Sequence, residues 1–244
     1  MGVPQEVLGE IINHLPTTVQ ATSARISRTW TYPANHSAYR AVDLLDEEAL
    51  KRWLEARRRP EHYVHVRSLS CAVGSFPRNT DHEENVKTFI NIDLPFFQNL
   101  HYLSLHSGYI ESNLLVPSFA FQSSLHTLTL DGCKVSISQL VILLNKFPVL
   151  VELDLHWIRD SVSYRYPPVL SHTPKKLSIK DHGLGWDVLD ELSNLEPRFE
   201  EITLDMDSKR SAQDIVNRSG GSLKRLNLKD TLDSMCHNHL TVLQ

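Results

Sequence analysis

The chain has 244 residues, of which 41% are hydrophobic and 22% charged, a composition typical of a globular protein. Its 25 basic and 29 acidic residues give a formal net charge of −4, which argues against a general nucleic-acid binder, because such proteins are normally basic. No apolar run is long enough to cross a bilayer, and the first residues lack the pattern of a secretion signal. Three scattered cysteines fit a reducing compartment, so we expect a cytosolic or nuclear protein.

The first segment of the chain, residues 3–16, predicts an amphipathic helix. Its apolar residues form two adjacent stripes at a spacing of four, namely Val7, Ile11 and Leu15 in one and Leu8 and Ile12 in the other. Thr17 offers an N-cap for a short second helix, and Ser23 offers one for a third helix that carries Ile26 and Trp30 on one face. Such short helices hold more apolar surface than they can bury together. We therefore expect a partner surface, either in another protein or in the rest of this chain.

These helices carry a recognisable motif. The segment from Val3-Pro4 to Leu15-Pro16, followed by Ile26 four residues before Trp30, resembles the F-box family, although Val3 replaces the usual leucine and residues 17–22 are mostly polar. The resemblance implies a three-helix unit over residues 1–40 that docks onto a Skp-type adaptor and, through it, a cullin ubiquitin ligase. The docking residues that it implies are Pro4, Val7, Leu8, Ile11, Leu15, Pro16, Ile26 and Trp30.

Residues 41–65 predict a bridging and capping segment, with a helix from Asp43 to Arg59. Three acidic residues near the start of this helix and three arginines in its last turn both favour the helix dipole. We expect Leu50, Trp53 and Leu54 to face inward and the helix to cap the first strand of the following array. The arginines 57–59 fit either an anion site or, as the favoured interpretation, a solvated helix end.

From residue 66 onward a six-residue template recurs: apolar, two variable residues, apolar, variable, apolar. Its seven copies begin at residues 66, 100, 125, 150, 174, 199 and 223, so that after the first interval the steps are 24 or 25 residues. A fixed period of this length indicates a solenoid. The last three positions of each copy predict a short strand with one apolar face, and segments such as 138–147 predict a returning helix. Stacked copies would share one continuous leucine core.

The template resembles the leucine-rich repeat over residues 66–244, which implies a curved array with the sheet on its concave side. The Asn or Cys that the family carries three positions after the last apolar residue occurs once, as Cys133, so we expect an irregular solenoid. The predicted fold is α/β, with a short N-terminal three-helix F-box-like unit, the bridging segment and an irregular leucine-rich-repeat solenoid whose parallel sheet has about seven strands.

Alternation with period 2 places three rows of mainly polar residues on the sheet face away from the leucines. One row reads Glu152, Lys176, Glu201 and Arg225, for which we favour a self-neutralising charge ladder over a ligand site. Aromatic side chains also gather on and near this face, as they do at interaction hot spots. The predicted substrate-binding residues are Tyr102, His106, Asp131, His156, Trp157, Tyr164 and Tyr166.

Chemistry of other kinds finds little support in the sequence. His106, Asp131 and His156 share a row and would fit a metal or acid–base site, but the chain has 13 histidines and such coincidences are easy. The segment 236–239 holds Cys and His without the second ligand pair that zinc sites use. Motifs for phosphate, dinucleotide, nucleophile-elbow or zinc-protease sites are missing from the sequence. We expect no catalytic residue, no metal and no cofactor.

The two resemblances together imply a non-enzymatic substrate receptor of a Skp-cullin-F-box ubiquitin ligase, whose repeats bind an unknown protein substrate and neither nucleic acid nor membrane. The alternative is a leucine-rich scaffold in which the first helices act only as an N-terminal cap. In that case their apolar stripes would pack on Leu50, Trp53 and Leu54. An enzyme is a distant third hypothesis.

Overall fold

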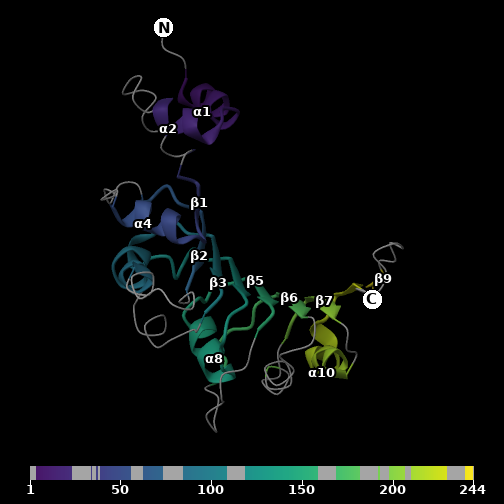
Figure 1. Ribbon diagram of the computed structural model, residues 1–244. Coiled ribbons are helices and arrows are strands. Elements are labelled where there is room, and N and C mark those ends of the chain that lie inside the picture. Colours follow the sequence, from purple (N-terminus) through teal and green to yellow (C-terminus); the bar gives the residue numbers. More distant parts are fainter. Residues whose placement is uncertain are drawn as a thin grey trace.

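The computed structural model describes residues 4–23, 34, 37, 39–55, 63–73, 85–108, 119–158, 169–181, 192, 198–206, 210–229 and 240–243. Within these ranges the chain forms five α-helices and one nine-stranded sheet, an α/β arrangement (Figure 1). None of the helices in these ranges is both long enough and apolar enough to span a membrane.

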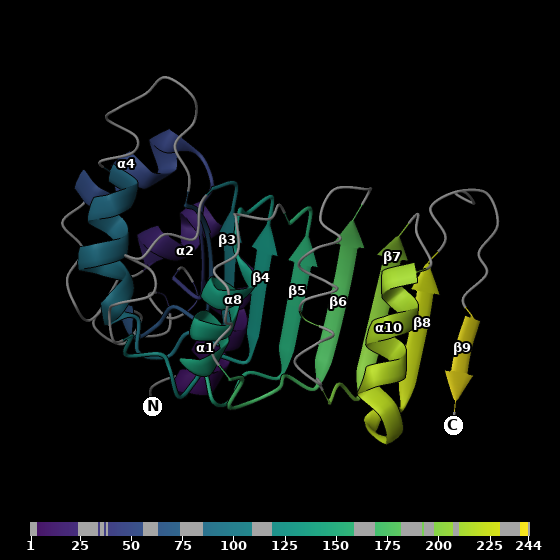
Figure 2. The same cartoon turned by 90° about the horizontal axis from the view of Figure 1, so that it is seen from below.

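The sheet has its strands in chain order (Figure 2). They are β1 (Ala41–Leu44), β2 (Ser68–Ala72), β3 (Tyr102–His106), β4 (Thr127–Asp131), β5 (Glu152–His156), β6 (Lys176–Asp181), β7 (Glu201–Met206), β8 (Arg225–Lys229) and β9 (Leu240–Leu243). The first eight strands are parallel, and β9 is antiparallel to β8. Each of the seven template copies forms a strand, as predicted, whereas β1 and β9 are additional.

The core lies on the leucine side of the sheet. The middle apolar positions of the first six template copies are buried, namely Leu69, Leu103, Leu128, Leu153, Leu177 and Ile202. The helices α8 (Ile137–Asn145) and α10 (Arg210–Ser219) lie on the same side of the sheet as each other (Figures 1 and 2), and both contribute buried residues to this core. Ser136 and Gln139 form a capping box that begins α8, so the predicted returning helix over 138–147 is confirmed.

The bridging segment differs from the prediction at its start. We expected the helix to begin at Asp43, but Ala41–Leu44 is strand β1, which pairs with the edge of β2, and the helix α4 covers Glu47–Glu55. The strand forms because the backbone of 41–44 completes a parallel ladder with Ser68–Cys71 while Leu44 enters the main core. The strand β1, rather than the helix, therefore covers the open edge of β2. Leu50 and Trp53 of α4 face inward as predicted.

Aromatic residues join α4 to the segment before β3. That segment consists of a π-helical turn η1 (Phe89–Asp93) and a 3₁₀ turn η2 (Leu94–Phe96). Trp53 Nε1 and Tyr63 Oη donate hydrogen bonds to the carboxylate of Asp93, at 3.2 and 2.8 Å. Burial raises the pKa of Asp93, and these two hydrogen bonds oppose that effect.

The chain begins with two helices, α1 (Gln5–Asn13) and α2 (Thr17–Ser23), at the end of the sheet that carries β1 (Figure 1). The buried amide of Gln20 holds them together, because its Nε2 donates to the carbonyl oxygens of Ile12 and Leu15, at 3.1 and 2.8 Å. Ile12 lies in the last turn of α1, where its carbonyl also accepts from Leu15 N–H at 2.9 Å, and Leu15 lies just beyond the end of the helix. The third predicted helix, over Ser23–Pro33, lies outside the described residues beyond Ser23.

Candidate functional site

The helix α1 presents one of its two apolar stripes to solvent. Leu8 and Ile12 are buried, whereas Val7 and Ile11 are 46% and 45% exposed. Val7 and Ile11 lie four residues apart and so occupy one face, which we call the exposed stripe of α1. Leu15 is half-buried, and Pro4 precedes the helix at its N-cap. The helix thus has one buried apolar stripe and one apolar stripe that is about half exposed.

The buried stripe of α1 does not join the main core. Among the described residues the main cluster begins at Leu44 and contains Leu50 and Trp53, but it does not include Leu8 or Ile12. Trp53 instead packs against aromatic rings of the main cluster, with its ring centroid 5.9 Å from that of Tyr63. If α1 acted as an N-terminal cap, its apolar stripes would pack on Leu50 and Trp53 of α4. Among the described residues, the buried stripe of α1 lies outside the cluster that contains these two residues.

The sheet face away from the leucines, here called the outer face, has the three rows that the period predicts. Tyr102, Thr127, Glu152, Lys176, Glu201 and Arg225 are register partners from β3 to β8. A second row contains Ser104, Thr129, Asp154, Ser178, Thr203 and Asn227, and a third contains His106, Asp131, His156, Lys180, Asp205 and Lys229. The structure therefore brings Tyr102, His106, Asp131 and His156 onto adjacent strands.

The middle row is unexpectedly buried on β3 and β4. Thr129 Oγ1 lies 3.3 Å from both Tyr102 Oη and Asp154 Oδ2, so the tyrosine hydroxyl and the carboxylate flank the threonine hydroxyl. Burial raises the pKa of Asp154, while the Thr129 hydrogen bond and the charges of two lysines on β6 oppose that rise. This part of the outer face is a polar layer in which Ser104 and Thr129 are buried, whereas Tyr102, His106 and Asp131 remain partly exposed.

Ser104, His106 and Asp131 form a relay within this layer. Ser104 Oγ lies 2.7 Å from His106 Nε2, and His106 Nδ1 lies 3.3 Å from Asp131 Oδ2. Serine hydrolases use the same order of hydroxyl, imidazole and carboxylate. Ser104 is, however, only 1% exposed in the middle of a strand, so a substrate cannot reach its hydroxyl. We interpret the relay as a network that satisfies buried polar atoms.

The remaining candidates for chemistry are also unfavourable. Within the described ranges, no group of three or more His, Cys, Asp or Glu side chains could hold a metal ion. Burial raises the pKa of the Cys71 and Cys133 thiols to about 12, so neither is a thiolate at neutral pH. Burial also lowers the pKa of His156, an effect that Lys180 adds to and Asp131 opposes. The neutral form of His156 is therefore favoured.

Trp157 stands at the rim of the outer face, directly after β5. It is exposed and has a φ of 48°, in the left-handed region that bulky residues rarely adopt. Ser107 and Gly132 follow β3 and β4 at the equivalent position, with φ values of 48° and 63°. The repeat therefore imposes this backbone conformation, and an exposed indole occupies it at a conformational cost.

We expect Trp157→Gly to leave the stability of the protein nearly unchanged. Relief of the left-handed strain, about 1–2 kcal/mol, offsets the larger conformational entropy of an unfolded glycine, about 0.5–1 kcal/mol. Gly132→Ala is the matched opposite change. It should cost about 1–2 kcal/mol, because alanine would be strained at a φ of 63°. No clash adds to this cost, since the new Cβ would meet only ordinary contacts at 3.5 Å or more. Urea denaturation of both variants checks this, and a loss above about 3 kcal/mol for Trp157→Gly would contradict the assignment of strain.

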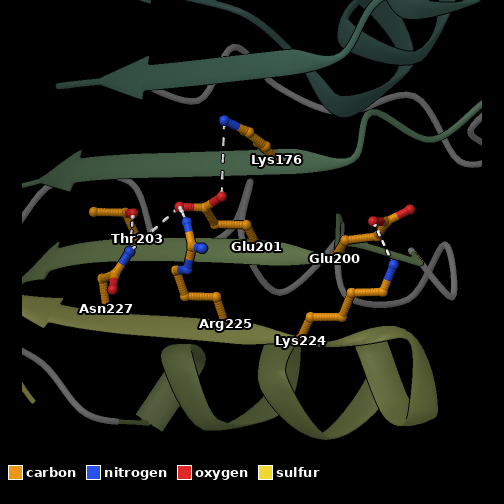
Figure 3. A network of polar contacts seen from close by, with 7 residues as sticks. All are labelled: Lys176, Glu200, Glu201, Thr203, Lys224, Arg225 and Asn227. Carbon is orange, nitrogen blue, oxygen red and sulfur yellow. Dashed lines mark hydrogen bonds and ion pairs between the residues drawn. The ribbon is translucent and has the colours of Figure 1, made fainter. Parts of the chain in front are cut away.

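The sequence predicts a charge ladder of Glu152, Lys176, Glu201 and Arg225 on β5–β8, and its members on β6, β7 and β8 form ion pairs. Glu201 carboxylate oxygens lie 3.7 Å from Lys176 Nζ and 3.2 Å from Arg225 Nη1 (Figure 3). A parallel row, which the sequence analysis did not single out, lies one residue earlier: Glu200 is 3.7 Å from Lys175 Nζ and 2.8 Å from Lys224 Nζ. The hydrogen bond from Lys224 lowers the pKa of Glu200. The sequence contained a signal for this second row, because the charge at the second template position also alternates in sign over the last three copies.

Several predicted residues lie outside the described residues. They are Ile26, Trp30, the arginines 57–59, Tyr164, Tyr166 and the segment 236–239. Conversely, sequence reasoning did not single out Ser104, Thr129 and Asp154 as individual contacts, because their burial depends on how Tyr102 lies across the neighbouring strand.

A scan against models of known protein families finds no match to the chain, and a search of curated proteins finds no match either. The function is therefore inferred from residue patterns and from the contacts described above.

Proposed function

We propose that the chain is the substrate-recognition subunit of a Skp-cullin-F-box ubiquitin ligase, acting in the cytosol or nucleus without catalytic residues of its own. The N-terminal helices dock onto a Skp-type adaptor, and the repeats hold a protein substrate. The F-box motif and the leucine-rich template, both resemblances of sequence, give the proposal its two parts.

The observation that carries the proposal is the exposed stripe of α1. Val7 and Ile11 belong to the aliphatic helix of the F-box motif, and because each is a little less than half exposed, roughly 0.7–1.4 kcal/mol of burial per side chain is left to be gained in a complex. The buried partners Leu8 and Ile12 keep the helix in place. An apolar helix face that stays about half exposed beside the described residues fits an adaptor-binding element.

The repeat half of the proposal has a second support. Segments that recur every 24 or 25 residues form neighbouring parallel strands in chain order, as an irregular leucine-rich-repeat solenoid requires. Such a sheet presents a broad polar outer face, onto which a substrate can dock.

The rival function is a scaffold in which the first helices serve as a cap. It requires the apolar stripes of α1 to pack on Leu50, Trp53 and Leu54. Leu8 and Ile12 are buried apart from the cluster that contains Leu50 and Trp53, which favours the docking proposal.

Capture of a purified Skp-type adaptor by the full chain tests the proposal. Val7→Asp combined with Ile11→Asp places two charges on the exposed stripe, so we expect capture to be lost while the far-ultraviolet circular dichroism spectrum and the unfolding midpoint stay close to those of the parent. The desolvation of two carboxylates in an apolar interface is the physical reason for the loss.

Val169→Asp is the matched control, because it adds a charge at another exposed aliphatic residue and should capture adaptor as the parent does. Failure of a folded parent chain to capture the adaptor would overturn the proposal and leave the scaffold function. Equal capture by the parent and the double variant would show that the adaptor binds elsewhere.

A further inference from the structure

The residue directly before each of the first four strands is an arginine or a histidine. Arg40, Arg67, His101 and His126 precede β1, β2, β3 and β4, and we call these four residues the basic row. Backbone hydrogen bonds place them side by side, because the N–H of each of the last three donates to the carbonyl oxygen of the one before, at 2.8 or 2.9 Å. The row therefore spans three strand spacings, about 14 Å. On β5 the same position holds the apolar Val151, where the row ends.

Within the described ranges, the side chains of the basic row form no ion pair with a carboxylate. The neighbouring row on the outer face is uncharged over the same strands, with Ala41, Ser68, Tyr102 and Thr127. The carboxylate of Asp43 on β1 accepts a hydrogen bond from the N–H of Leu45, at 3.1 Å. The first acidic residue beyond β4 in that neighbouring row is Glu152, whose next register partner is Lys176. The basic row therefore keeps the two positive charges of its arginines at neutral pH.

The Arg67 guanidinium is held in place by two acceptors of the next repeat. Its Nη1 donates to the carbonyl oxygen of Asn99 at 3.3 Å and lies 3.1 Å from His101 Nε2. A guanidinium has N–H donors on all three of its nitrogens, and only Nη1 makes these contacts, so the other two can bind a carboxylate. A cation fixed in this way loses less side-chain entropy on binding than a free surface arginine does.

The two imidazoles are arranged as donors. Arginine can only donate, so His101 Nε2 accepts and the proton of the neutral ring lies on Nδ1. His126 Nδ1 lies 2.6 Å from the carbonyl oxygen of Ser124, which can only accept, so this nitrogen carries a proton as well. The two Nδ1 atoms are 3.2 Å apart. Two protonated nitrogens cannot ligate a metal ion between them, and an anion is the ligand that they favour.

Protonation of the row is linked to its occupation by an anion. Burial lowers the pKa of His101, and the positive charges of Arg67 and His126 lower it further, whereas a hydrogen bond to the backbone of Ser124 opposes this effect. A bound anion supplies the negative charge that stabilises a protonated imidazole. Anion binding should therefore strengthen as the pH falls through the range in which histidine titrates.

We propose that the basic row binds an acidic peptide segment of a partner protein. Carboxylates two residues apart in an extended peptide are about 7 Å from each other, so two or three of them fit along the row. The inference does not rest on the proposed function, because adaptor capture uses the exposed stripe of α1, whereas the peptide contacts the residues that precede β1–β4.

A nucleic acid fits the basic row less well than a short peptide does. A row of about 14 Å contacts only a few phosphates of a continuous backbone. The rest of a long polyanion meets the chain as a whole, whose net charge of −4 repels it. A short acidic segment meets mainly the local positive charge of the two arginines.

Fluorescence anisotropy with the full chain tests the inference. The probe is a rhodamine-labelled peptide of alternating aspartate and serine, and the control peptide has asparagine in place of aspartate. We expect the aspartate peptide to bind more tightly at about pH 5.5 than at about pH 7.5, a range over which aspartate stays ionised and histidine titrates. The asparagine peptide should not bind, and the affinity for the aspartate peptide should fall as the salt concentration rises.

Two variants of the row separate its fixed charges from its titrating ones. Arg40→Gln with Arg67→Gln should weaken binding about two- to thirtyfold, since each exposed ion pair contributes a modest amount. Arg40→Gln alone, at an exposed side chain, should weaken it about 1.5- to fivefold and serves if the double variant does not fold. His101→Gln with His126→Gln should flatten the dependence on pH.

Lys224→Gln with Arg225→Gln is the matched control. It removes two positive charges on and just before β8, where they pair with Glu200 and Glu201, and it should leave binding close to that of the parent. Four results would overturn the inference: no binding by the folded parent, unchanged binding in the arginine variants, equal losses in the β8 control, or weaker binding at the lower pH. Tighter binding of a single-stranded RNA of the same charge would also overturn it and assign the row to nucleic acid.

Discussion

Phe121→Ala should lower the free energy of unfolding by about 3–5 kcal/mol. Phe121 is fully buried in a cluster of three rings, with centroid distances of 5.0 Å to Phe119 and 5.8 Å to Phe147, which are themselves 6.2 Å apart. Phe119 and Phe121 precede β4, and Phe147 follows α8, so the stack joins the connections of successive repeats on the leucine side of the sheet. Loss of the Phe121 ring removes its contacts with both other rings of the stack and leaves a cavity in the close-packed core.

Phe96→Ala is the matched control, because this phenylalanine is exposed and packs against Tyr63 alone among the described rings, at a centroid distance of 6.3 Å. We expect it to cost about 1 kcal/mol. Urea denaturation followed by circular dichroism measures both variants. Similar losses for the two would mean that the stack does not hold the repeats together.

The strands could be predicted because two independent signals coincide in each template copy. Alternation of apolar and polar residues defines the strand, and the constant spacing places the copies side by side, which is why the register of the outer rows follows directly from the sequence. Strand β1 carries the template as well, because Tyr39, Val42 and Leu44 hold its three apolar positions, and Val42 and Leu44 pair with Leu69 and Cys71 of β2. This copy lies 27 residues before the one at Val66, and the acidic residues after Leu44 are typical of a helix start, so the predicted helix began too early.

For the candidate surfaces, the sequence predicts which residues share a face but not how exposed each residue is. Period 2 places Tyr102 and Thr129 on one face, but whether that face is hydrated or closed depends on where the tyrosine side chain lies. On α1 both stripes are equally apolar, so the sequence could not decide which of Ile11 and Ile12 is buried. The left-handed backbone at Trp157 had a signal in Gly132, which occupies the equivalent position one repeat earlier.

Ile12→Asp should unfold the first two helices and leave the sheet intact. Loss of the buried isoleucine costs about 2–5 kcal/mol through its apolar contacts, and the buried carboxylate adds a desolvation penalty. Within the described residues the buried side chains of α1 are separate from the main core, so the penalty should stay local. Hydrogen exchange measured by mass spectrometry should show lost protection in peptides from α1 and parent-like protection in β3–β5.

Ile11→Asp is the neighbouring control, since the same charge on the exposed stripe should leave α1 protected. The pair separates two ways of losing adaptor binding: Ile12→Asp removes the helix that presents the surface, and Ile11→Asp changes the surface on a helix that stays folded. If Ile12→Asp lowers protection of β3–β5 as much as that of α1, the helices are part of the main cooperative unit, and the cap function regains its physical basis. If only α1 opens, the helices form a separately stabilised element, as docking to an adaptor requires.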